Sequence, residues 1–320
     1  MTKLVNLFAS RAGEVAALCR RTIEADFGGC ERGRTPWEWY RLLQDFPVMP
    51  VGRYPPTDSV HIASVAELRR AKRALAGGWP PGAFERYVLL QAMLVSAPQV
   101  PELRLDASVK RMILDLFARF ARPSAREAAY FDLDGPRFPE MAEVATLERF
   151  PAGQYEWRNE CLPRAWVLTT QPLAVPALIR TMWKLGTNPY ARFHVNYWRA
   201  NPLMVFGAEA ERSFWRISRS LALQPENKGL LGVSWFYSTA LYKTTPHMRW
   251  TRDFFLARGA LLAEMEHASD DAGFLTGSAK RRQLFEEGKF RPRLTLVVWP
   301  RDDMLAWAES RPDLADQGGE

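Results

Sequence analysis

The sequence predicts an α+β protein, with a helical N-terminal part followed by a mixed α/β region whose central sheet is flanked by helices. Three observations predict this class. Hydrophobic residues follow helical spacing up to residue 130, runs rich in β-branched and aromatic residues begin after residue 150, and helical patterns separate those runs. We therefore expect a helical region over 1–150, a mixed region with the candidate site over 151–310, and a flexible tail over 311–320.

Capping residues and prolines set the ends of the predicted helices in the first region. Thr35 can cap a helix that has Pro36 in its first turn, and Ser64 with Glu67 fits a capping box. Prolines exclude a helix over 47–58. The predicted helices cover residues 4–26, 35–46, 64–77, 82–97 and 106–121.

Strand-like and helix-like segments alternate in the second region. The expected strands cover residues 155–157, 165–168, 193–197, 230–237 and 294–299. The expected helices cover residues 172–185, 207–222, 278–287 and 302–309. This alternation predicts a mixed sheet with several central strands.

Composition excludes several classes of protein. The 320 residues are 47% hydrophobic and 25% charged, which excludes disordered, collagen-like and disulfide-scaffold proteins. Three cysteines without a CxxC pair indicate a reduced, cytoplasmic protein. Because the chain shows neither a secretory signal nor a long apolar window, we expect no membrane partner.

The net charge of +7 permits an anionic partner without identifying one. Of the 43 basic residues 35 are arginines, spread evenly along the chain, and a GC-rich coding sequence would produce the same excess. No signature of an RNA-recognition, zinc-finger or helix-turn-helix module is present. Nucleic acid is therefore a partner that the sequence does not favour, and the oligomeric state stays open.

Polar residues gather near tryptophans in the C-terminal half and predict a small-molecule site. Alternation over 193–198 puts His194, Asn196 and Trp198 on one strand face, where they would line an aromatic pocket. For His194, a hydrogen-bonded place in the core is the alternative.

A second group of candidate residues follows the predicted strand over 230–237. Ser234 and Tyr237 would donate or relay protons, and His247, next to Pro246 in a turn or loop, would be the base. Simple turn packing is the alternative for His247. The neighbouring residues predicted to bind substrate are Trp235, Arg249 and Trp250.

A capped helix over 278–287 is a candidate anion site. Ser278 would cap the helix, and Lys280, Arg281 and Arg282 lie in its first turn. A helix N-terminus with free N–H groups and nearby cations can hold an anion, so Ser278 and Arg281 are predicted anion ligands. An ordinary surface helix is the alternative.

Three further groups of residues are given structural roles. The acidic run 264–271 fits no metal motif, so we predict a solvated charge run and expect no metal. Cys161 has no histidine near it in sequence and is predicted to be a buried or half-buried thiol. The tryptophans that fall on helical patterns and are predicted to pack in the core are Trp37, Trp183 and Trp215.

The end of the capped helix resembles the C-terminal part of GNAT-type acyltransferases. Phe285, Glu286, Gly288 and Phe290, followed by the strand over 294–299, are similar to that family's last helix, its junction and its final strand. The family's Arg/Gln-x-x-Gly-x-Gly/Ala loop, which cradles the pyrophosphate of the donor, is not recognisable in the chain. The resemblance implies a transferase with an acyl donor such as acyl-CoA or an acyl carrier protein.

These observations favour a cytoplasmic bacterial enzyme that acts on a small molecule in an aromatic-lined pocket, by acyl or other group transfer. Arg249 and Arg281 would neutralise an anionic substrate or donor. The alternative is a non-catalytic binding or accessory protein with an anionic partner, namely RNA, tRNA or an acidic protein. Salt distinguishes the two, because affinity for phosphates falls steeply with ionic strength.

Overall fold

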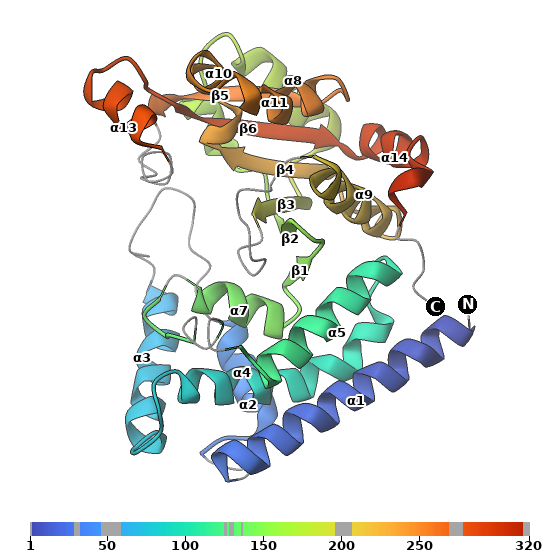
Figure 1. Ribbon diagram of the computed structural model, residues 1–320. Coiled ribbons are helices and arrows are strands. Elements are labelled where there is room, and N and C mark those ends of the chain that lie inside the picture. The colour runs from blue at the N-terminus through green and yellow to red at the C-terminus, as the bar shows by residue number, and fades with distance from the viewer. Residues whose placement is uncertain are drawn as a thin grey trace. The chain divides into compact units, whose positions relative to one another are not determined.

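A computed structural model describes residues 2–28, 33–45, 59–124, 127, 131–135, 137–195, 207–268 and 278–315 of the chain (Figure 1). The chain divides into two compact units, residues 1–151 and 152–320. The predicted class is confirmed, because helices precede a mixed sheet that is itself surrounded by helices.

The first unit is helical up to one short strand at its end. Its described elements are α1 (Thr2–Phe27), α2 (Pro36–Gln44), α3 (Ser59–Leu75), α4 (Ala83–Ser96), the 3-10 helix η1 (Ala97–Glu102), α5 (Ala107–Ala121), α7 (Phe138–Ala145) and β1 (Arg149–Pro151). In α1 buried hydrophobic residues recur every three or four positions, as an amphipathic helix requires; they are Phe8, Ala12, Val15, Cys19, Ile23 and Phe27.

The cap predicted at Thr35 is present, and the one predicted at Ser64 is not. Thr35 Oγ1 accepts a hydrogen bond from the N–H of Glu38, and the Thr35 N–H donates to the Glu38 carboxylate at 2.7 Å. Ser64 instead lies inside α3, where its hydroxyl donates to the carbonyl of Asp45 at 2.9 Å. The prediction was wrong because α3 begins five residues earlier, at Ser59.

The second unit alternates strands and helices. Its described elements are β2 (Tyr155–Glu160), η2 (Arg164–Thr169), α8 (Val175–Leu185), β3 (Tyr190–Val195), α9 (Ala208–Ala222), β4 (Gly229–Ser234), η4 (Trp235–Tyr237), α10 (Thr239–Thr244), η5 (Pro246–Arg249), α11 (Trp250–Leu256), β5 (Leu261–Ala268), α13 (Ala279–Glu286), β6 (Arg293–Pro300), α14 (Arg301–Glu309) and η6 (Pro312–Leu314).

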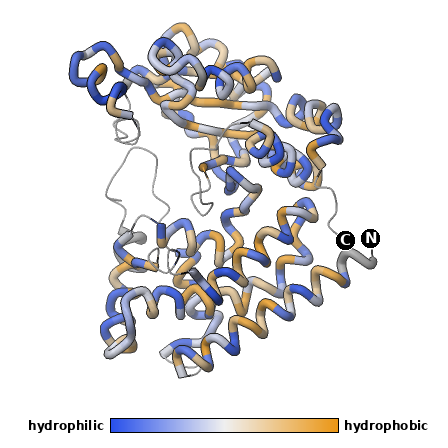
Figure 2. The backbone as a smooth tube through the Cα atoms, in the orientation of Figure 1, coloured by the Kyte–Doolittle hydropathy of each residue, from blue (hydrophilic) through white to orange (hydrophobic). Residues whose placement is uncertain are grey.

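In the second unit the strands follow the order β2-β3-β4-β6-β5. Within that unit β3 and β4 are parallel, whereas β2–β3, β4–β6 and β5–β6 are antiparallel. The parallel pair is joined by a crossover that contains α9, as a parallel connection requires. Figure 2 shows hydrophobic residues along β6, which is paired on both sides.

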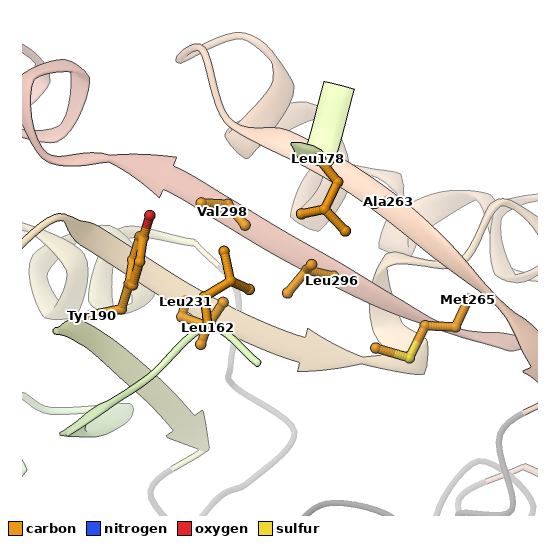
Figure 3. Packing of buried hydrophobic residues seen from close by; sticks show 8 residues of the cluster. All are labelled: Leu162, Leu178, Tyr190, Leu231, Ala263, Met265, Leu296 and Val298. Atoms are coloured by element: carbon orange, nitrogen blue, oxygen red, sulfur yellow. The ribbon is translucent and has the colours of Figure 1, made fainter. Parts of the chain in front are cut away.

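Each face of this sheet has its own hydrophobic cluster. On one face the Phe214 ring of α9 lies 4.6 Å from Tyr155 and 5.2 Å from Phe193, and Trp299 of β6 lies 5.7 Å from Phe255 of α11. On the other face Leu178 of α8 packs against the strands (Figure 3). The buried members of that second cluster are Leu162, Leu178, Tyr190, Leu231, Ala263, Met265, Leu296 and Val298.

Three expectations for the secondary structure of the second unit were wrong. Residues 165–168 belong to the 3-10 helix η2 rather than to a strand, and their side chains are not buried. The run 264–271, predicted as a solvated charge run, begins inside β5, where Met265 is buried and pairing with β6 decides the conformation. The strand predicted over 230–237 ends at Ser234, because Trp235–Tyr237 form the 3-10 helix η4. The turn or loop predicted around His247 is the four-residue 3-10 helix η5, which leads into α11.

Residues 311–315, at the start of the predicted tail, pack on the second unit. Leu314 is buried, and Arg311 donates to Glu211 of α9 at 2.5 Å and forms an ion pair with Asp313 at 2.8 Å. Among the helices that the structure describes, none combines the length and the apolar character needed to cross a bilayer.

Candidate functional site

The ladder between the parallel strands β3 and β4 ends before their carboxyl ends. They pair at only two positions, Ala191 with Leu230 and Arg192 with Leu231. Beyond Arg192, β3 stays paired with β2 as far as Val195, and β4 stays paired with β6 as far as Ser234. We call residues 193–195 and 232–234 the strand fork, because each branch is held from outside while the ladder between them has ended.

An aromatic ring occupies one face of the fork. A Cβ added to Gly232 would lie 2.2 Å from Cε1 of Phe193, so the Phe193 ring lies directly against the backbone of β4 at this glycine. Phe193 is buried and is held at edge-to-face angles by Tyr155, Phe214 and Tyr237. Only a residue without a side chain at position 232 leaves room for this ring.

The outer ends of the fork are more accessible than the paired parts of the same strands. His194, Val195, Val233 and Ser234 are half-buried, whereas the preceding four residues of each strand are buried. In open sheets, ligands bind at the carboxyl ends of parallel strands, next to a change in strand order. The fork lies at the carboxyl ends of the parallel pair, whereas the change in strand order lies on the other side of β4, where β4 pairs with β6.

A charged strand face adjoins the fork. In β2 the residues that alternate away from the aromatic cluster are Glu156, Arg158 and Glu160, and they lie opposite His194, Arg192 and Tyr190 of β3. Arg192 pairs with Glu160 at 2.5 Å, and Arg158 pairs with the same carboxylate. His194 therefore lies at the end of a row of paired charges, and Phe193 points to the other face.

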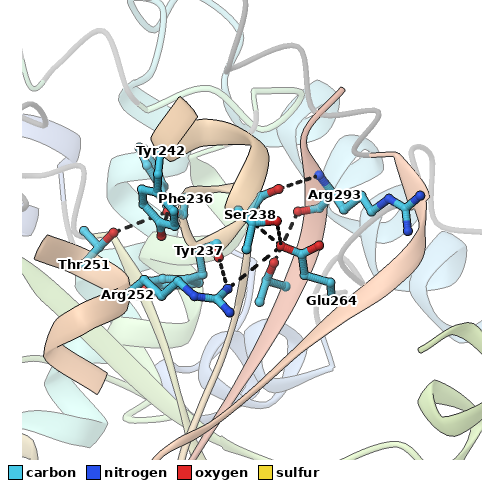
Figure 4. Close-up of polar contacts among 10 residues, drawn as sticks. Phe236, Tyr237, Ser238, Tyr242, Thr251, Arg252, Glu264 and Arg293 are labelled. Atoms are coloured by element: carbon cyan, nitrogen blue, oxygen red, sulfur yellow. Dashed lines mark hydrogen bonds and ion pairs between the residues drawn. The ribbon is translucent and has the colours of Figure 1, made fainter. Parts of the chain in front are cut away.

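A network of polar contacts holds the segment that follows β4 (Figure 4). Glu264 of β5 accepts hydrogen bonds from the N–H of Thr239 at 2.6 Å and from its hydroxyl at 2.8 Å. Arg252 of α11 donates to the carbonyl of Tyr237 at 2.9 Å and lies 3.9 Å from the Glu264 carboxylate. Trp235–Tyr237 are thereby fixed relative to β5.

The carbonyl of Phe236 is the second anchor of this segment. The hydroxyls of Tyr242 and Thr251 donate to it at 3.1 and 3.3 Å, respectively. Ser238 Oγ, in turn, accepts from the N–H of Arg293 in β6 at 3.1 Å. Anchors on β5 and β6 fix the backbone on the carboxyl side of the fork.

The structure brings some predicted site residues close to the fork. Ser234 ends β4, and its Oγ accepts a hydrogen bond from the N–H of Phe236 at 3.2 Å. Tyr237 is buried, its ring lies 6.4 Å from Phe193, and burial raises its pKa well above the usual range. Tyr237 therefore keeps its proton at neutral pH, so its hydroxyl can donate a hydrogen bond but cannot act as a base.

Trp235 and Arg281, predicted to belong to two separate sites, lie together. The Arg281 guanidinium lies 5.6 Å from the Trp235 ring centroid, and Trp235 stacks on Phe236 at 4.3 Å. Partial burial lowers the pKa of Arg281. Ser278 caps α13 as predicted, and its Oγ accepts from the N–H of Arg281 at 3.3 Å.

Two other predicted residues lie elsewhere in the unit. Arg249 is exposed and pairs with Asp253 one turn later at 3.1 Å. Trp250 begins α11, and its ring lies 5.2 Å from Phe254 on the aromatic face of the sheet. The roles proposed for the two residues in substrate binding stay predictions.

Some predicted residues lie outside the described part of the chain. Asn196 and Trp198 follow the last described residue of β3. The backbone of His247 lies in η5, and its side chain is outside the description. Within the described residues, no group of three or more His, Cys, Asp or Glu side chains is arranged to hold a metal ion.

The exposure of the Cys161 thiol differs from the prediction. Cys161, expected to be buried or half-buried, is exposed, because it follows the last residue of β2 and does not enter the core. Cys19 is buried in the first unit, where burial raises its pKa to about 12.

We expect iodoacetamide at pH 8 to alkylate Cys161 in the native protein and to leave Cys19 unmodified, because the thiolate is the reacting species. Peptide mass spectrometry after brief labelling measures this, with urea-unfolded protein as the control in which both react. Fast labelling of Cys19 in folded protein would contradict the prediction.

Comparison with known proteins adds one distant likeness. No family model and no curated protein matches the chain. The chain is similar to the crystal structure of an acyltransferase variant in complex with octanoyl-CoA, with 13% identity over 88% of this chain and 99% of the other, and a TM-score of 0.38. A score this low does not show a shared fold, so the functional argument rests on the geometry described above.

Sequence reasoning missed the charged face of β2 and β3 and the Glu264 anchor. The charged face could have been predicted from the strict alternation of aromatic or amide residues with charged ones over 155–160. For Glu264 no local signal exists, since its role depends on Thr239 and Arg252 of two other elements.

Proposed function

We propose that the strand fork binds the pantetheine arm of an acyl thioester and that the chain transfers the acyl group to a small acceptor. The observation that supports this proposal is that the β3–β4 ladder ends early, while β3 stays paired with β2 and β4 stays paired with β6. An extended chain that bears amide groups can add to such strand ends as another strand would. Pantetheine is an extended chain with two amides, and CoA and acyl carrier proteins share it.

The chemistry of the transfer needs a base next to the fork. The acceptor's nucleophile attacks the thioester carbonyl, the C–S bond breaks, and the acceptor's proton passes through the base to the departing thiol. His194, at the end of β3, and His247, in η5, are the candidate bases in this proposal. Tyr237 and Ser234 would supply hydrogen bonds, and Trp235 would form part of an apolar wall.

Hydrogen exchange of the backbone amides in the strand fork, measured in the full chain, tests this proposal. S-acetylpantetheine and acetyl-CoA should each slow exchange in peptides that contain 193–195 and 232–234, whereas adenosine 3′,5′-bisphosphate should not. Tighter binding of acetyl-CoA than of S-acetylpantetheine would point to CoA as the source of the arm, and equal binding to a carrier protein. If neither thioester protects these peptides, the proposal is wrong.

Variants of the candidate bases provide a second test, in which thiol release is measured together with exchange protection. With an acceptor identified from a panel of amines and alcohols, loss of the base should lower thiol release by about 100-fold or more while leaving exchange protection intact. The variants are His194→Ala and His247→Ala, with Lys243→Ala at an exposed position as the control. Steeply salt-dependent binding of tRNA without thioester binding would instead favour the non-catalytic alternative.

A further inference from the structure

Four large hydrophobic side chains project from one short stretch of the second unit. Leu168 of η2 is 82% exposed, Leu173 in the following turn 96%, and Ile179 and Trp183 of α8 are 50% and 88% exposed. We call these four residues the α8 patch. Exposed apolar side chains scattered singly are ordinary, but four of them within one short stretch of chain indicate a contact surface.

The opposite side of α8 already supplies its contribution to the core. Leu178 is the buried residue of this helix, and Met182, one turn later, packs against the same cluster. Ile179 and Trp183 are likewise one turn apart but follow Leu178 and Met182 by one position, so they line a different side of α8. The helix is therefore apolar on a side that the sheet does not cover, and the prediction of a core position for Trp183 was wrong.

The chain segment that carries the α8 patch has charges of one sign, and the nearest acidic side chains from another element that packs against it are Glu264 and Glu266 of β5. The sequence contains no Asp or Glu from residue 161 to residue 208. Arg164, Arg180 and Lys184 lie among the patch residues and are exposed. A partner that covered the patch would therefore meet apolar side chains together with positive charge, and an anionic surface complements both.

We infer that the α8 patch docks on an anionic lipid surface. A symmetric contact with a second copy of the chain would place like charges opposite each other, which disfavours a homodimer here. Trp, Leu and Ile that project outward, with Lys and Arg beside them, are the composition of interfacial helices, whose apolar side chains enter the lipid boundary while the cations meet the headgroups. The docking needs no spanning segment and is independent of the proposed acyl transfer.

Vesicle flotation of the full chain tests this inference. The protein should float with vesicles of phosphatidylcholine that contain phosphatidylglycerol, less with phosphatidylcholine alone, and less at high salt. Trp183→Ala should weaken binding about tenfold, since most of its apolar contact with the lipid is lost. Trp37→Ala is the matched control, because Trp37 is also exposed, at 53%, but lies on α2 in the first unit.

A second pair of variants separates lipid insertion from a general loss of solubility or fold. Leu173→Asp should abolish flotation, whereas Leu223→Asp, at an exposed leucine of 49% on another element, should leave it unchanged. Arg180→Glu with Lys184→Glu should weaken binding to anionic vesicles by about tenfold or more. No flotation at low salt, or equal loss in Trp37→Ala and Trp183→Ala, would overturn the inference and would leave a protein partner as the occupant to seek.

Discussion

Gly229→Ala should destabilise the second unit by roughly 3–5 kcal/mol. Gly229 begins β4 with a φ of +145°, a conformation that residues with a side chain rarely adopt. A Cβ at this position would lie 2.1 Å from the carbonyl oxygen of Trp299 and 2.9 Å from the amide nitrogen of Arg301. Both are backbone atoms of the paired strand and the helix after it, so neither can move without disturbing the β4–β6 ladder.

Gly207→Ala is the control that separates clash from backbone strain. Gly207 also has a positive φ, of +82°, but among the described residues nothing lies within 4 Å of an added Cβ, so we expect a loss of about 1 kcal/mol. Urea titration, followed by hydrogen exchange in peptides of each unit, shows which unit loses stability. Equal losses in the two variants would contradict the geometry at Gly229.

Gly232→Ala should destabilise the second unit by about 2 kcal/mol and disturb the strand fork, because the new methyl group must displace the Phe193 ring. The ring cannot simply rotate away, since Tyr155, Phe214 and Tyr237 surround it. Phe193→Leu makes room at the cost of aromatic contacts. The double variant should therefore lose less stability than the sum of the losses in the two single variants, by about 1 kcal/mol.

This double-mutant cycle also tests whether the Phe193 ring lies against Gly232. If the ring lies against β4 as described, Phe193→Leu should restore in the Gly232→Ala background the exchange protection that the single variant loses. Strict additivity of the two stability losses would show that the ring does not contact Gly232 in solution. The readouts are unfolding free energy and exchange at 193–195 and 232–234.

The sequence predicted helices best where capping chemistry is local. Thr35, Glu38 and Pro36 lie within four residues, and the predicted helix start matches the structure. Ser64 and Glu67 carry the same signature, yet α3 begins at Ser59, because a capping box can also lie inside a helix. The identical pattern cannot distinguish the two cases without the tertiary contact from Ser64 to Asp45.

For the candidate site, the sequence predicted the right region but not its geometry. It predicted a strand over 230–237, whereas in the structure β4 ends at Ser234 and Trp235–Tyr237 form the 3-10 helix η4. It assigned Trp235 and Arg281 to separate sites, although the folded chain stacks one over the other across 46 positions in the sequence. Contacts at such separation depend on strand pairing, which local patterns do not encode.

The sequence by itself determined the class of the protein, the helical character of the first unit and the positions of most elements in the second. Only the tertiary structure decided that the β3–β4 ladder ends early, that β5 is a strand despite its acidic residues, and that Trp183 faces outward. The physical reason is the same in each case. Periodicity shows that an element has an apolar side, but the long-range packing of strands and helices decides which sides are covered.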